Sequence, residues 1–152
     1  MKPAVPTTED PAARSAQMAR IRAKDTKPEM RVRRVLHAAG LRYRLHASRL
    51  PGKPDIVFGP VRLAINVHGC FWHRHPDPDC RLARLPKSRL DFWEGKLRGN
   101  RDRDVANRAA LERMGWTVIE VWECQISDKS LQALVETVRS IQSRARAREG
   151  AT

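Results

Sequence analysis

The chain has 152 residues, of which 30 are lysine or arginine and 17 are aspartate or glutamate, so its formal net charge is +13. That length suits one domain with its own hydrophobic core, and no apolar run approaches the roughly 20 residues that a membrane span needs. The excess of positive charge favours a polyphosphate partner such as nucleic acid, although an ordinary basic surface would have the same composition.

The N-terminal part of the chain is predicted to lack a packed structure. Residues 1–13 are rich in Pro, Ala and Thr without periodicity, which predicts a disordered leader, and they contain no apolar core like that of a signal peptide. We therefore expect a cytoplasmic protein whose three cysteines are not joined by disulfides. Residues 14–24 form a basic arm that could become helical against a phosphate backbone.

The first predicted helix begins at Thr26 and ends at Gly40. Thr26 and Glu29 form the T-x-x-E pattern of a capping box, and apolar residues then recur at helical spacing. Apolar and polar residues alternate over 41–45, which predicts a half-buried strand.

Two further extended runs, at 55–58 and 61–67, are separated only by Gly59 and Pro60. Such a short separation predicts a β-hairpin. The segment HGCFWHRHPDPDC, residues 68–80, follows directly. It therefore leaves from the end of a central strand, a position that is both rigid and open.

A long helical region is predicted over 88–114, with Ser88 and Asp91 as a capping pair and a glycine after it as the stop. Gly95 and Gly99 are expected to bend or split this helix, since glycine is a weak helix former.

The remaining segments complete the predicted fold. The β-branched and aromatic residues of 116–122 predict a buried strand, and a last helix carries an apolar stripe that ends at Ile141. Residues 144–152 are expected to form a frayed tail. The order of elements predicts one domain over 25–143, an α/β sandwich in which helices flank a small mixed β-sheet.

The segment 68–80 contains the residue types of a metal site. Cys70, His75 and Cys80 are close enough in sequence to meet around one ion, and Cys124 closes the last strand. Three thiolates and an imidazole are a standard tetrahedral set for structural zinc, and a closed set of four leaves no open position for chemistry. His73 could replace His75, and Cys124 alone could be a small buried hydrophobe.

A second group of polar residues lies at the ends of the predicted hairpin. Asp55 opens one strand and His68 ends the other, so antiparallel pairing returns His68 to the edge where Asp55 lies. An aspartate there is well placed to bind Mg²⁺, and an imidazole beside it can move a proton during phosphodiester hydrolysis. The alternatives are that Asp55 is a turn residue and that His68 satisfies a strand end.

Five segments of the chain carry a resemblance to a known family. They are DTKPE (25–29), PGKPD (51–55), VHGCFWH (67–73), DFWEGK (91–96) and GWTVIEVWEC (115–124). In register from about Arg14 to Ile141, the chain resembles the very short patch repair endonucleases, which nick DNA beside thymine–guanine mismatches. The resemblance implies a type II restriction-endonuclease-like fold.

The resemblance also implies roles for individual residues. Asp55 looks like the Mg²⁺-binding aspartate, and the backbone carbonyl of Val67 looks like a further metal contact. His68 and His73 look like the histidines that assist water attack and contact the scissile phosphate. Glu29 looks like the acid that the first helix contributes, although its capping role would also account for it. The set Cys70, His75, Cys80 and Cys124 resembles the structural zinc ligands of the family.

The chain departs from related patterns at two places. Restriction-like nucleases in general have a second acid and a lysine on the strand where this chain has Asn66 and His68, and the repair branch also lacks that lysine. His75 and Cys80 are separated by Pro-Asp-Pro-Asp, which is longer than the usual spacing of the family.

Aromatic and basic residues are the expected contacts with DNA. Phe71 and Trp72, between a zinc ligand and a catalytic histidine, and Trp93 on the long helix resemble rings that intercalate at the mismatch, where prying a base step apart costs less. The alternative for each is core packing, which we expect for Trp116 and Trp122. The remaining expected contacts are Met18 against the minor groove, with Arg14, Arg20, Arg22, Lys87, Arg89 and Lys96 at phosphates.

These expectations describe a Mg²⁺-dependent, zinc-stabilised endonuclease that nicks one strand 5′ to the thymine of a T:G mismatch, in repair of deaminated 5-methylcytosine. Double-stranded DNA is the expected partner and a monomer the expected state, with no membrane contact. Recruitment by a mismatch-repair protein stays open. The rival interpretations are another restriction-like nuclease and a catalytically inactive, zinc-stabilised DNA-binding module.

Overall fold

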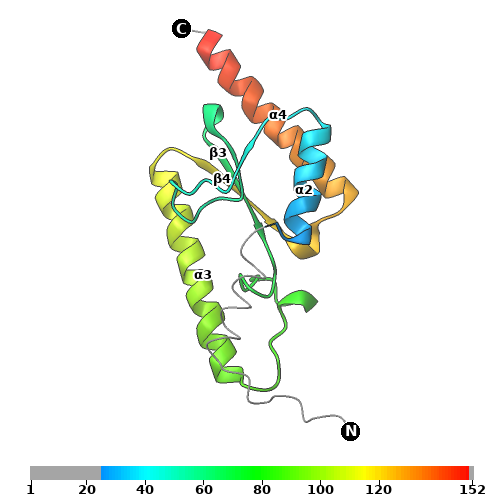
Figure 1. The fold of residues 1–152 in the computed structure, drawn as a ribbon, viewed down its shortest axis with the longest axis vertical. Coiled ribbons are helices and arrows are strands. Elements are labelled where there is room, and N and C mark those ends of the chain that lie inside the picture. The colour runs from blue at the N-terminus through cyan, green and yellow to red at the C-terminus, as the bar shows by residue number, and fades with distance from the viewer. Residues whose placement is uncertain (1–24, 151–152) are drawn as a thin grey trace.

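Residues 25–150 are described by the structure, a computed structural model (Figure 1). In chain order they form α2 (Lys27–Ala38), β1 (Arg44–Leu45), β2 (Ile56–Phe58), β3 (Leu63–His68), α3 (Leu90–Arg113), β4 (Thr117–Trp122) and α4 (Asp128–Gly150). Short 3₁₀ turns occupy Gly59–Val61, Arg81–Ala83 and Glu123–Gln125. The predicted leader (1–13) and basic arm (14–24) lie outside the described residues.

The strands form one mixed sheet in the order β1-β2-β3-β4. The pairs β1–β2 and β2–β3 are antiparallel, which confirms the predicted hairpin, and β3–β4 is parallel. The parallel register sets Asn66 opposite Glu120 and His68 opposite Trp122. The segments that follow β3 and β4 therefore start from neighbouring points on the same edge of the sheet.

Helices cover both faces of the sheet, with α2 and α4 together on one side and α3 on the other (Figure 1). The larger core cluster lies on the α2 and α4 side and includes Leu36, Phe58, Ile65, Leu131 and Val135. The smaller cluster consists of Val57, Ala64, Leu111 and Val118 and joins the sheet to α3. Because side chains alternate along a strand, Asn66, His68 and Glu120 share the α3 side of the sheet with this smaller cluster. The α/β architecture with a small mixed sheet and flanking helices is thus confirmed.

The start and end of α2 match the prediction. The Thr26 hydroxyl accepts the backbone N–H of Glu29 at 3.3 Å, and Gly40 follows the helix with a φ of +79°. The Glu29 carboxylate accepts the backbone N–H of Asp25 at 3.2 Å, one residue before the expected cap position.

The prediction for α3 was wrong in two respects. Its N-cap is Arg89, which has a left-handed φ of 55° and makes no side-chain cap, so Ser88 and Asp91 are not a capping pair. The helix runs unbroken for 24 residues through Gly95 and Gly99. A glycine inside a helix costs only about 1 kcal/mol, and the buried residues Leu97, Asn100 and Leu111 hold this helix against the rest of the protein.

Three other elements differ from the prediction, in length or in burial. Strand β1 has only two residues, and the backbone N–H of Leu41 donates to the carbonyl of Leu36 at the end of α2 instead of pairing in the sheet. Strand β4 is mostly half-buried, with Val118 its one fully buried residue. Helix α4 continues to Gly150, past the predicted tail boundary at 144, since the arginines and alanines there favour a helix. Within residues 25–150, no helix combines the length and the apolarity of a bilayer span.

Candidate active site and zinc centre

A cavity of about 220 Å³ lies where α2, the β2–β3 hairpin and α3 meet. Its lining includes the whole set of catalytic candidates, namely Glu29, Asp55, Val67, His68 and His73. The structure thus brings together side chains from three segments that lie far apart in sequence. We refer to this cavity as the catalytic pocket.

Asp55 reaches the catalytic pocket from a tight loop. Gly52 in that loop has a φ of +74° and approaches α3 so closely that an added Cβ would lie 2.9 Å from the Cβ of Asn107, so only glycine fits there. The backbone N–H of Val67 donates to Oδ2 of Asp55 at 2.7 Å, and that of His46 donates to the carbonyl of Asp55 at 3.0 Å. Burial raises the pKa of Asp55, which the bond from Val67 opposes. A cation in the pocket would favour the ionised carboxylate.

Two imidazoles face one another in the catalytic pocket. The ring centroids of His68 and His73 are 4.3 Å apart. Nε2 of His68 lies 3.2 Å from Oε2 of Glu120, and Nδ1 of His73 lies 2.6 Å from Oδ2 of Asp104. Each ring is therefore held by its own carboxylate, which orients it and leaves its other nitrogen for substrate.

Glu29 is buried and belongs to both the helix cap and the catalytic pocket. Its Oε2 lies 2.8 Å from Nε2 of His46 and accepts a bond from Nη1 of Arg33 at 3.0 Å. Ligand atoms of Asp25, Glu29 and His46 all lie within 4.8 Å of one another. Because Arg33 also contacts Asp25 at 2.6 Å, its guanidinium already neutralises these two acids, and a metal ion here would face repulsion.

The zinc candidates converge just beyond the C-terminal end of β3, beside the catalytic pocket. Ligand atoms of Cys70, His75, Cys80 and Cys124 all lie within 4.8 Å of one another. Cys70 follows β3 and Cys124 follows β4, so the parallel pairing of the two strands brings them together. His75, not His73, is the imidazole in this cluster, since His73 points to Asp104.

The chemistry of these four side chains fits a soft divalent cation. Burial raises the pKa of the Cys70 thiol to about 12, whereas a hydrogen bond from His75 lowers that of Cys80 to about 7. Three thiols in so small a volume cannot all ionise without a cation between them, because their like charges repel. Three thiolates and an imidazole form a donor set for structural zinc, which these residues would hold with no open position.

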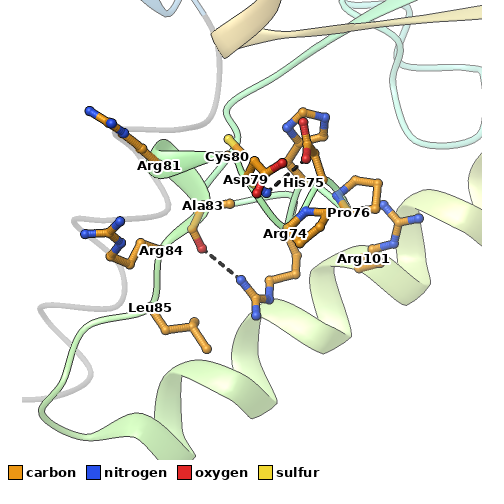
Figure 2. A pocket seen from close by; sticks show the side chains of 12 residues that line it. Arg74, His75, Pro76, Asp79, Cys80, Arg81, Ala83, Arg84, Leu85 and Arg101 are labelled. Atoms are coloured by element: carbon orange, nitrogen blue, oxygen red, sulfur yellow. Dashed lines mark hydrogen bonds between the residues drawn. The ribbon is translucent and has the colours of Figure 1, made fainter.

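The residues between His75 and Cys80 form a turn. The backbone N–H groups of Cys80 and Asp79 both donate to Asp77, at 3.1 and 2.9 Å, and this turn brings Cys80 back to the cluster. Figure 2 shows the cavity of about 820 Å³ beside this loop, where Arg74 donates to the carbonyl of Ala83 at 2.8 Å. The extra residues thus lie at the surface without displacing a ligand.

The three aromatic rings that were predicted to intercalate at the mismatch form one half-buried cluster. Ring centroids are 5.0 Å apart for Phe71 and Trp72, 5.4 Å for Phe71 and Trp93, and 6.0 Å for Trp72 and Trp93. None of the three belongs to either core cluster. We refer to Phe71, Trp72 and Trp93 as the aromatic cluster. Rings that pack on one another and stay partly exposed can be offered to another molecule.

The other tryptophans divide between core and site. Trp116 packs against the smaller core cluster, as expected. Trp122 lies outside both core clusters, so that expectation was wrong. It stacks on the zinc candidate His75 at 4.3 Å and contacts His68 at 4.8 Å, and it therefore joins the zinc centre to the catalytic pocket.

The basic DNA-contact candidates are only partly described. Lys87 and Arg89 are exposed beside the start of α3, where the Arg89 guanidinium lies 4.6 Å from the centroid of the Phe92 ring. Lys96 is half-buried on the same helix. The remaining candidates lie outside the described residues, namely Arg14, Met18, Arg20 and Arg22.

Sequence reasoning missed several residues that line the catalytic pocket, among them Asp104, Arg108 and Glu120. Glu120 had a visible signal, because it is an acid inside the otherwise apolar run TVIEVW. Asp104 and Arg108 had none, since the run RDRDVANR is also typical of a solvated helix face.

Comparisons with known proteins identify relatives of this chain. A family model described as DNA mismatch endonuclease Vsr matches residues 7–81. The type II nicking enzyme V.XorIIP of Xanthomonas oryzae is 50% identical over 131 residues, which cover 86% of this chain and 93% of that protein. The type II nicking enzyme V.NmeAIP of Neisseria meningitidis is 42% identical over 84% of this chain and 91% of its own length. DNA mismatch endonuclease Vsr of Escherichia coli is 40% identical over 77% of this chain and 73% of its own length.

Proposed function

The chain belongs to the Vsr family of DNA endonucleases, and on that basis we propose that it nicks one strand of duplex DNA 5′ to the thymine of a T:G mismatch, with Mg²⁺ as cofactor. The observation that carries the proposal is the meeting of Asp55, His68 and His73 in one pocket, with the half-buried rings of Phe71 and Trp72 directly before His73 in the chain. The mixed sheet with helices on both faces supports a restriction-endonuclease-like fold.

We assign the metal to Asp55 and the backbone carbonyl of Val67. Asp55 uses Oδ2 for the bond from Val67, which leaves Oδ1 for a cation. Mg²⁺ bound there would supply positive charge to the phosphate that is cleaved. Burial strengthens such an interaction because the local dielectric constant is low.

The two imidazoles carry the proton transfers in this proposal. One imidazole accepts a proton from the attacking water as the water oxygen bonds to phosphorus. The other imidazole contacts the scissile phosphate. The phosphorus–oxygen bond to the leaving sugar oxygen breaks as the new bond forms, and that oxygen takes up a proton from a water molecule. The carboxylates of Glu120 and Asp104 keep the two rings in place during this exchange.

The aromatic cluster accounts for preference at a mismatch. A T:G pair stacks less well than a matched pair, so inserting rings beside it costs less than elsewhere in a duplex. The zinc centre would hold Phe71 and Trp72 rigid, since Cys70 and His75 flank them in the sequence. Zinc is structural in this arrangement, because its four protein ligands leave no site for substrate.

The biological role that follows is repair of T:G mismatches formed when 5-methylcytosine deaminates. We place the enzyme in the cytoplasm with double-stranded DNA as its partner. A cytosine methyltransferase in the same cell would generate its substrate. Recruitment by a mismatch-repair protein is compatible with this role.

Strand-specific nicking tests the proposal. End-labelled duplexes that differ only in one pair, T:G, U:G or C:G, are incubated with the full chain and Mg²⁺. We expect one cut, 5′ to the thymine of T:G, and far slower cutting of C:G. Cleavage of both strands of the C:G duplex would favour the rival restriction-like nuclease. Binding of the T:G duplex with no cut in any flanking sequence would favour an inactive DNA-binding module.

A further inference from the structure

Strand β4 contributes the carboxylate of Glu120 to the catalytic pocket. In the proposed mechanism this carboxylate only keeps the His68 ring in place. Glu120 lies opposite Asn66 in the parallel register, on the face of the sheet that looks toward α3. Its side chain is 22% exposed and makes contacts through both oxygens. Oε2 lies 3.2 Å from Nε2 of His68, and Oε1 accepts a bond from Nη1 of Arg108.

We propose that Glu120 is a positioning residue that holds His68 by Nε2 and so makes Nδ1 the nitrogen of His68 that acts on substrate. This inference rests on the proposed function, in which His68 acts on the scissile phosphate or the attacking water. An ionised carboxylate only accepts hydrogen bonds, so the 3.2 Å contact of its Oε2 with Nε2 is favourable when Nε2 carries the proton. The neutral ring of His68 then has its lone pair on Nδ1.

The neighbouring histidine has the opposite arrangement. Asp104 engages Nδ1 of His73 at 2.6 Å, which leaves Nε2 of that ring for substrate. The two ring centroids are 4.3 Å apart, so a substrate in the pocket would meet the two imidazoles through different nitrogens. Each carboxylate thereby fixes which nitrogen of its imidazole is left for substrate, so two similar side chains can take different tasks.

The contact with Arg108 further restricts the orientation of the Glu120 carboxylate that holds His68. A carboxylate that is bonded on one oxygen only can rotate about its own side-chain bonds. With Arg108 on Oε1 and His68 on Oε2, the plane of the Glu120 carboxylate is fixed from both sides. The pKa of Glu120 falls to about 2, chiefly through the bond with His68 and further through Arg108, so the acceptor stays ionised.

A role for Glu120 as a metal ligand fits less well. Restriction-like nucleases carry a second acid on the strand where this chain has Asn66, so Glu120 is the obvious substitute in position. Both of its oxygens already contact donors, however, and the adjacent guanidinium of Arg108 repels a cation. Mg²⁺ at Glu120 would have to break two charge-assisted bonds.

Glu112 offers a matched control for this proposal. It is an acid on α3 that pairs with the same arginine, with 3.7 Å between its Oε2 and Nε of Arg108. Its side chain is 53% exposed, and it is absent from the lining of the catalytic pocket. Glu112→Gln therefore removes a charge beside Arg108 without touching His68.

The kinetic test compares Glu120→Ala, Glu120→Gln and Glu112→Gln in the full chain. Single-turnover nicking of a T:G duplex at saturating enzyme measures the chemical step, and the dissociation constant of the duplex is measured separately. We expect Glu120→Ala to slow the step roughly 10- to 100-fold with duplex affinity unchanged, as for other residues that orient a catalytic group. Glu120→Gln keeps an acceptor oxygen and should recover most of the rate. Glu112→Gln should match the wild type. A wild-type rate in Glu120→Ala would overturn the proposal.

A spectroscopic test separates this inference from the proposed function. Nitrogen-15 shifts of the His68 imidazole in the full chain identify the tautomer of the neutral ring without any reaction. We expect the Nε2–H form in the wild type and in Glu112→Gln, and a mixture of tautomers in Glu120→Ala. A wild-type ring with its proton on Nδ1 would refute the assignment, even if Glu120→Ala fails to fold. Absence of nicking by the wild type would count against the proposed function alone.

Discussion

The assignment of Mg²⁺ to Asp55 makes a prediction that needs no DNA. In the wild type the backbone N–H of Val67 donates to Oδ2 of Asp55 at 2.7 Å. The amide oxygen of Asp55→Asn can still accept this bond, so the loop should keep its position. The substitution removes one negative charge that burial disfavours, as the raised pKa of Asp55 indicates. We therefore expect Asp55→Asn to be at least as stable as the wild type without Mg²⁺.

Addition of Mg²⁺ should then raise the thermal midpoint of the wild type and not that of Asp55→Asn. A ligand that binds only the folded state at ten times its dissociation constant stabilises that state by about 1.4 kcal/mol. For a protein of this size, about 1 kcal/mol shifts the thermal midpoint by roughly 2–4 °C, so the wild type should gain roughly 3–6 °C. Asp55→Asn should gain nothing at the same concentration, because its pocket lacks the charged ligand.

Thermal unfolding followed by circular dichroism, with Mg²⁺ titrated at constant ionic strength, measures both effects. Asp102→Asn is the matched control, since Asp102 is an exposed aspartate on α3. That variant should respond to Mg²⁺ as the wild type does. Equal stabilisation of Asp55→Asn and the wild type would refute the metal assignment, and a large loss of stability in Asp55→Asn without Mg²⁺ would refute the account of its burial.

Three further predictions follow from the described geometry. The purified chain should contain about one zinc ion, which His75→Gln should lose and His73→Gln should keep, as measured by atomic absorption; retention in both variants would remove His75 from the ligand set. The pKa of Glu120 lies at about 2 against an ordinary value of 4.5, so its contacts contribute stability that is present above about pH 4.5 and is lost as the pH falls toward 2. The unfolding free energies of the wild type and Glu120→Gln, which differ by at most about 3 kcal/mol at neutral pH, should therefore converge in acid, and a constant difference would contradict the shift. Trp72→Ala should weaken binding of a T:G duplex by roughly 1–3 kcal/mol and leave binding of a matched duplex unaffected, as measured by fluorescence anisotropy. An equal loss of affinity for both duplexes would mean that the Trp72 ring does not insert at the mismatch.

Local patterns were enough to predict much of the fold. The Thr26 cap, the glycine after α2 and the two apolar runs of the hairpin each depend on residues a few positions apart, so their geometry follows from backbone sterics and alternation. The same patterns failed for α3, where Gly95 and Gly99 resemble breaks. Contacts made by the rest of the helix outweigh their weak helical preference.

The residue types of the candidate site were also visible in the sequence, since the segment 68–80 and Cys124 contain the set of zinc candidates and Asp55 and His68 mark the hairpin ends. Only the tertiary structure decided between His73 and His75, because that choice depends on where each ring points and not on spacing. It alone brought Glu120 from β4, with Asp104 and Arg108 from α3, to the two imidazoles, because a contact across strands and helices leaves no periodic trace in a sequence.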